Sequence, residues 1–269
     1  MITHQLTGKL RFEDHLVPKQ NPWGLDAVAK LEHLAIVTYA VDPDRFRGMI
    51  PERFSLYTIP VEGKPKALLS VVPFINTEFR LAAFPYYKAT MGQMNYRIYV
   101  QDIHTGANAV WFLGTVLDSP AIVVPRNVWQ LPWHRGKIRF QCDFDPEAKL
   151  YRSYQVKTES DWAPARITIA QDEGALEEFE LGGFPDLETA LVLLTHPLVG
   201  YYHRRDGKLG CSRVWHHRME VKPGKLVSAY FGLLDKLQLV TPPEQLRPHS
   251  VLLTPATEFI VYLPPRVIE

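Results

Sequence analysis

Proline is the residue that most restricts how this chain can fold. The 269 residues include 22 prolines, roughly 8% where about 5% is usual. Proline lacks the N–H that helix interiors and central strands need, so regular elements must fit between the prolines. Residues 34–41, 67–75 and 109–117 are such stretches, and their β-branched and aromatic content favours strands. We therefore predict a mainly β (α+β) fold with a few short helices, including one over residues 187–194 that Asp186 caps.

The charge balance argues against a nucleic-acid partner, and the lengths of the apolar runs argue against a membrane span. The chain has 30 Lys and Arg residues against 29 Asp and Glu residues, a formal net charge of +1, whereas a nucleic-acid binder needs a surplus of clustered positive charge. No apolar run approaches the ~18 residues of a membrane span. The first residues lack a basic segment followed by an apolar stretch, so we expect no signal peptide. Cys142 and Cys211 are isolated in the sequence, which is typical of reduced thiols. We expect a cytoplasmic protein with neither nucleic-acid nor membrane partners.

The chain divides into an arm and a single domain. Residues 1–29 are polar and broken by Pro18 and Pro22, and they look like an N-terminal arm laid over the remainder. Residues 30–269 contain no repeat, low-complexity tract or Pro/Ser linker, so we expect them to form one β-barrel domain. An Asp-Gly pair at Asp206 lies between extended flanks and predicts a hairpin.

One predicted strand carries a polar face. Residues 93–100 alternate with a period of two, and this places the side chains of Gln93, Asn95, Arg97 and Tyr99 on one side. The first interpretation is an ordinary amphipathic edge strand whose polar face meets water. The second is a row of hydrogen-bond donors that points into a cavity. The pattern alone leaves both open.

Several standard sites are missing from the sequence. We find no Gly-x-Gly-x-x-Gly after a strand, no phosphate-binding P-loop and no Gly-x-Ser-x-Gly elbow. His216 and His217 are adjacent, and neighbours in a strand point to opposite faces, so both cannot easily bind one metal ion. We expect no metal site and no cofactor, and the partner to be a small molecule.

Four segments resemble the acetoacetate decarboxylase-like superfamily, and especially its large, mostly uncharacterised branch. The matching stretches are residues 36–43 with 50–52, residues 120–126 with Leu131 and Pro132, Asp206-Gly207 with Cys211, and residues 248–265. They occur in the family's order between about residues 30 and 266. The resemblance implies a conical antiparallel β-barrel with a flanking sheet, an enclosed site inside the cone, and a homo-oligomer.

The resemblance also implies that the family's usual chemistry is absent. Its decarboxylases form a Schiff base between a β-keto acid and a lysine, whose pKa an adjacent lysine lowers. At the matching position this chain has Trp133 and His134, and neither forms an imine. A family arginine falls at Glu32, and a family glutamate falls at Gln93, a neutral isostere. We therefore expect classical acetoacetate decarboxylase activity to be missing.

These positions define the candidate site. We assign proton transfer to His134 and the binding of a carboxylate or enolate to Arg97 with Gln93. The expected substrate-binding residues are Trp133, Asn95, Arg126, Glu32 and Tyr99.

Two functions fit this site. The leading hypothesis is a cofactor-independent enzyme of lyase, isomerase or cyclase type that acts on a carbonyl-containing or enolisable small molecule without a Schiff base. The other is a non-catalytic small-molecule-binding protein that kept the cavity. A third interpretation gives no site at all, because Arg97 would pair with Glu78 or Glu32 inside a filled core.

Overall fold

The protein is mainly β, as the sequence predicts. A computed structural model describes residues 2–171, 176 and 182–268, and about 54% of the chain is strand. The described strands are β1 (Ile2–Gln5), β2 (Ala27–Val41), β3 (Phe54–Val61), β4 (Lys64–Leu81), β5 (Ala89–Asp102), β6 (Asn108–Leu117), β7 (Trp133–Arg135), β8 (Lys137–Asp145), β9 (Leu150–Glu159), β10 (Ala165–Gln171), β11 (Val199–His203), β12 (Leu209–His216), β13 (Lys222–Phe231) and β14 (Ser250–Ile268). The helices are α1 (Phe12–His15), α2 (Val123–Val128), α3 (Leu187–Thr195), α4 (Gly232–Lys236) and α5 (Pro242–Gln245), with 3₁₀ turns η1 (Pro43–Phe46) and η2 (Pro120–Ile122).

Seven of the strands close into a ring. Hydrogen-bonded neighbours run in the order β2, β4, β5, β6, β11, β12 and β14, and β14 pairs again with β2. The ring is not wholly antiparallel, because β11 pairs with β6 in parallel. Outside the ring, the pairs β1–β3 and β6–β7 are also parallel. The sheet is therefore mixed, which corrects the expectation of a purely antiparallel barrel.

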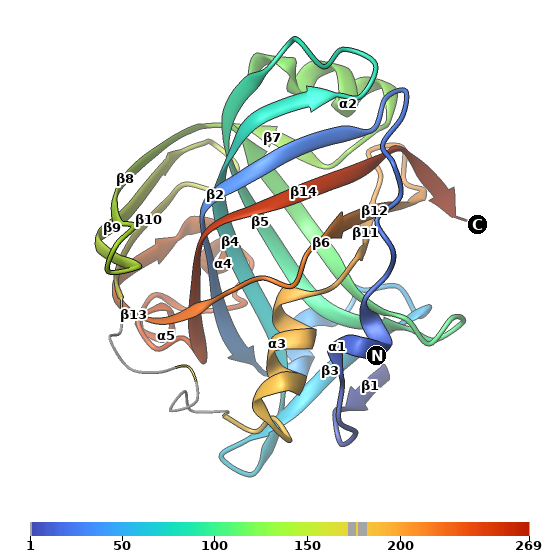
Figure 1. Cartoon of the computed structure of the whole chain (residues 1–269). Helices are drawn as coiled ribbons and strands as arrows, with labels where there is room; N and C mark the ends of the chain where they lie inside the picture. Colours follow the sequence, from blue (N-terminus) through green and yellow to red (C-terminus); the bar gives the residue numbers. More distant parts are fainter. Residues whose placement is uncertain (1, 172–175, 177–181, 269) are drawn as a thin grey trace.

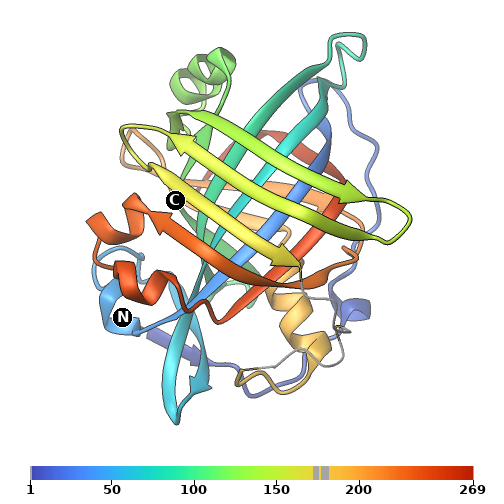
Figure 2. The same cartoon turned by 90° about the vertical axis from the view of Figure 1, so that its left-hand side faces the viewer.

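The two faces of the ring pack against different partners. On the inner face, Leu34, Ile36 and Tyr99 join a core with residues of α3, which lies near one end of the ring (Figure 1). On the outer face, Met94, Tyr96 and Ile98 pack against the sheet formed by β8, β9, β10 and β13. In Figure 2 this outer sheet lies across the ring strands. Burial of both faces explains why these strands read as nearly continuous apolar runs.

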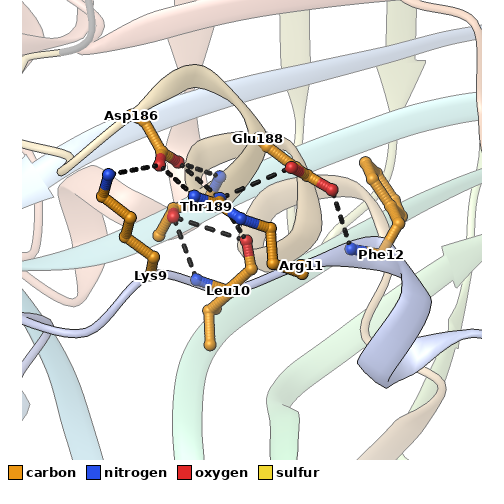
Figure 3. A network of polar contacts seen from close by, with 7 residues as sticks. All are labelled: Lys9, Leu10, Arg11, Phe12, Asp186, Glu188 and Thr189. Carbon is orange, nitrogen blue, oxygen red and sulfur yellow. Dashed lines mark hydrogen bonds and ion pairs between the residues drawn. The ribbon is translucent and has the colours of Figure 1, made fainter.

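The N-terminal arm is tied to the domain. Its first residues form β1, and the last three residues we assigned to it, 27–29, begin the long strand β2. Arg11 donates to both carboxylate oxygens of Asp186, over 3.1 and 2.8 Å. Glu188 accepts from the backbone N–H of Phe12 over 3.0 Å, and Thr189 accepts from that of Leu10 over 3.0 Å (Figure 3). The arm thus binds the first turn of α3.

Local sequence signals explain several element boundaries. Asp186 accepts from the backbone N–H of Thr189 over 2.9 Å and so caps α3, as predicted. Asp42 caps η1 in the same way, with Pro43 in the first turn. β12 ends at His216, and β13 begins at Lys222, after the segment 217–221 that lies in neither strand. No described helix is long and apolar enough to cross a membrane.

Candidate functional site

The ring encloses a cavity of about 150 Å³. An apolar cavity of this size can hold a molecule such as benzene, which sets the scale of a ligand. Most of its wall is apolar, with side chains from every ring strand. The polar residues that line it are Asn76, Gln93, Asn95, Arg97, Thr115, Thr195, Tyr202, Ser212 and His216.

β5 contributes the polar row that the alternation predicts. β5 is a central strand between β4 and β6, so its polar face does not meet bulk water as an edge strand would. Gln93, Asn95 and Arg97 line the cavity, while Met94 and Tyr96 lie in the core on the other face. The polar face therefore borders a cavity.

The neutral amides form a chain of hydrogen bonds at one part of the wall. Asn76 donates to Oε1 of Gln93 over 3.0 Å, and Gln93 donates to Oδ1 of Asn95 over 2.9 Å. The hydroxyl of Thr115 also donates to Oδ1 of Asn95, over 2.9 Å. This sequence of bonds fixes the amide orientations and leaves Nδ2 of Asn95 as a donor without a partner in the described part of the chain.

Arg97 is a cation that forms no ion pair with any described carboxylate. Its Nη2 donates to the carbonyl of Leu194 over 2.8 Å and to the hydroxyl of Tyr99 over 3.2 Å. Its Nε is buried and has no partner among the residues that the structure describes. The alternative pairings fail, because Glu78 binds Lys88 over 2.9 Å and Glu32 binds Lys30 over 2.6 Å. The N–H groups of Nη1 form no hydrogen bond to a described residue, and they can bind an anion through charge-assisted hydrogen bonds.

His216 also lines the cavity and is only 3% exposed. Its Nδ1 lies 2.8 Å from the carbonyl oxygen of His217, which can only accept, so Nδ1 carries the proton. Its ring stacks on Phe259, with centroids 5.2 Å apart, and meets His196 edge to face at 4.8 Å. Burial, together with the nearby charges of His196 and Arg97, lowers the pKa of His216 to about 3. The neutral ring keeps a lone pair on Nε2.

Trp133 and His134 lie on opposite sides of β7. Trp133 pairs with Thr115 and lines the cavity. His134 pairs with Val116, and its ring stacks on Trp162 outside the cavity, with centroids 3.9 Å apart. Burial and the charges of Arg126 and Arg205 lower the pKa of His134 to about 4. We expected both side chains beside the ligand, and the alternation of a strand explains why only one is there.

Three further expected residues do not line the cavity. Glu32 is next to Leu31, which does line it, and therefore points away. Arg126 lies on α2, and its backbone carbonyl accepts from Arg205 over 3.3 Å. Tyr99 is fully buried behind Arg97 and also donates to the carbonyl of Leu194 over 3.2 Å. Tyr99 can therefore position Arg97 but not touch a ligand.

A family model settles where this chain belongs. The model named DUF2071, described as an uncharacterized conserved protein, matches residues 28–258, most of the chain. The chain belongs to the DUF2071 family. No curated protein matches it.

Solved structures share the fold of this DUF2071 chain. The enduracididine biosynthesis enzyme MppR complexed with pyruvate is 12% identical, with a TM-score of 0.54 over 98% of this chain and 99% of that one. Acetoacetate decarboxylase from Legionella pneumophila is 14% identical (TM-score 0.51, 96% and 95% covered). An acetoacetate decarboxylase-like enzyme from Sphingomonas wittichii RW1 is 11% identical (TM-score 0.55, 92% and 94% covered). The resemblance to the acetoacetate decarboxylase-like superfamily is thus confirmed at the level of the fold.

Sequence reasoning missed part of the cavity wall. Ser212, Val214 and His216 alternate along β12 and line the cavity together. The alternation is visible in the sequence, but it does not show which face of β12 points into the ring. Asn76 and Thr115 were missed for the same reason, since each lies in a strand that reads as apolar on both faces.

Proposed function

We propose that this DUF2071 protein is a cofactor-independent enzyme that acts on a small oxo acid or a similar enolisable molecule without a Schiff base. Arg97 holds the substrate carboxylate inside the ring. The observation that carries the proposal is the guanidinium without a described counter-charge in a mostly apolar cavity. Taking an ion out of water costs several kcal/mol unless charged or polar partners compensate, and a ligand carboxylate supplies them.

Two further observations support this reading. Among the described residues no lysine lines the cavity, which fits the loss of the imine route. MppR, which has the same fold, is known in complex with pyruvate. Pyruvate is therefore a suitable probe of the size and charge that Arg97 and the cavity would accept.

Calorimetric titration with pyruvate tests the binding role of Arg97. We expect Arg97→Met to weaken binding roughly 10- to 100-fold, because hydrogen bonds to a charged group contribute about 1.5–3 kcal/mol. Methionine keeps most of the apolar length of the side chain, so the thermal midpoint should change little.

Arg166→Met is the matched control, because Arg166 is exposed on β10 and does not line the cavity. It should bind pyruvate as the wild type does. Equal affinity of the wild type and Arg97→Met would refute the assignment. Pyruvate binding without any turnover of oxo acids would favour the alternative of a non-catalytic binding protein.

A further inference from the structure

One proton-transfer group is available inside the cavity. Among the described lining residues, His216 is the only histidine, and the lining contains no carboxylate, lysine or cysteine. The phenol of Tyr202 also lines it, but burial raises its pKa to about 12, so it stays neutral. His134, which the sequence favoured for proton transfer, stacks on Trp162 outside the wall.

The tautomer of His216 suits a base. Its Nδ1–H is committed to the carbonyl of His217, so Nε2 carries the lone pair and has no hydrogen-bond partner among the described residues. Stacking on Phe259 and the edge contact with His196 fix the plane of the ring. The orientation is therefore set before a ligand arrives, which is what a proton acceptor in an active site requires.

We infer that Nε2 of His216 is the base that removes a proton from the carbon next to the carbonyl of the bound oxo acid, an inference that rests on the proposed function. With pyruvate, the methyl C–H bond breaks and its electron pair forms the C=C bond of the enolate. The carbonyl π pair moves onto oxygen, and the proton moves to Nε2. Return of the proton to carbon reverses the step, and no other reactant is needed.

Because of the charges around His216, a bound anionic ligand makes the proton transfer to its ring more favourable. The charged and titratable groups that affect it are Arg97, His196 and His217, and no carboxylate of the described residues bonds to its ring. Burial, His196 and Arg97 keep the imidazole neutral, so its lone pair is free, but they also make it a weak base. A bound carboxylate offsets the charge of Arg97, and the enolate adds a second negative charge. Both changes stabilise the imidazolium that forms.

Exchange of the methyl protons of pyruvate in D₂O, followed by proton NMR, measures the step directly. The wild type should exchange them faster than protein-free buffer. His216→Gln keeps a polar atom near the position of Nε2, and His216→Asn keeps a donor near that of Nδ1, but neither titrates. Both should lower the exchange rate by about 10²-fold or more and change the pyruvate affinity by less than about threefold.

His134→Gln is the matched control, because His134 is a half-buried histidine outside the cavity, and it should exchange at the wild-type rate. Exchange at the wild-type rate in the His216 variants would overturn the inference, as would a wild type that binds pyruvate but exchanges no faster than buffer. A wild type that does not bind pyruvate would instead refute the proposed function, and the inference with it.

A measurement on the wild type covers the case in which the His216 variants do not fold. Oxamate has the shape of pyruvate but no C–H bond to break. Its binding should shift the nitrogen NMR signal of His216 Nε2, because that lone pair faces the ligand. Saturating oxamate with no shift at Nε2 would overturn the inference.

Discussion

The side chain of Arg97 is fixed by neutral groups that leave its charge uncompensated. The carbonyl of Leu194 and the hydroxyl of Tyr99 hold Nη2, and the ring of Tyr99 lies 5.4 Å from the guanidinium carbon. Leu194 lies in the last turn of α3, where the helix dipole favours a positive charge. These contacts orient the guanidinium and leave its other N–H groups without hydrogen bonds to any described residue, so the site can accept an anion.

Gly200 tests how closely the cavity wall is packed. A Cβ placed there would lie 2.3 Å from Cε2 of Phe112, and both residues line the cavity. Gly200→Ala should lower the free energy of unfolding by about 1–3 kcal/mol, because the ring must move inside a packed wall. Urea unfolding measures this. Gly8→Ala is the control, since a Cβ added at Gly8 would meet nothing within 4 Å, and an equal loss at both positions would contradict the close packing of the wall.

At the scale of elements, the alternation of side chains along a strand was the main basis for predicting which residues share a face. The period of β5 correctly separated Gln93, Asn95 and Arg97 from the core face of the strand. In β7 the same rule separates Trp133, which lines the cavity, from His134, which does not, whereas the sequence analysis grouped both in one site. Which face of a short strand turns inward depends on the pairing of β7 with β6. That pairing is a tertiary contact, and the three residues of β7 alone do not specify it.

The contact between the N-terminal arm and α3 leads to a second prediction at this scale. Arg11→Met removes the paired hydrogen bonds to Asp186. This pair is partly exposed, so its loss should loosen the arm only modestly, and amide hydrogen exchange in residues 9–16 should become a few times faster. Lys9→Met is the control, because Lys9 is 64% exposed and lies 3.8 Å from the same carboxylate. A similar acceleration in both variants would show that the arm is not held by Arg11.

At the scale of the whole molecule, ring closure creates the cavity. The prolines and the short apolar runs predicted a mainly β fold, and the resemblance predicted an enclosed site. Closure itself depends on the parallel pairing of β6 with β11 and on β14 meeting β2. These contacts join segments about 90 and 220 residues apart, and no local pattern in the chain specifies such distant partners. The sequence therefore predicted the polar row but not the full wall around it.

The absence of a lysine from the described cavity wall predicts the result of imine trapping. Incubation with pyruvate or acetoacetate and borohydride should give no mass adduct, because an imine needs an amine beside the carbonyl. Lys137, the nearest lysine in sequence to Trp133, is exposed on β8. A reduced adduct on Lys137 or on any other lysine would show that a Schiff base forms after all.

The most direct test of the proposed site is a crystal structure of the protein soaked with pyruvate. We predict non-covalent pyruvate inside the ring, with its carboxylate within hydrogen-bond distance of the free N–H groups of Arg97. Pyruvate bound only outside the ring, or bonded covalently to a lysine, would contradict the proposal.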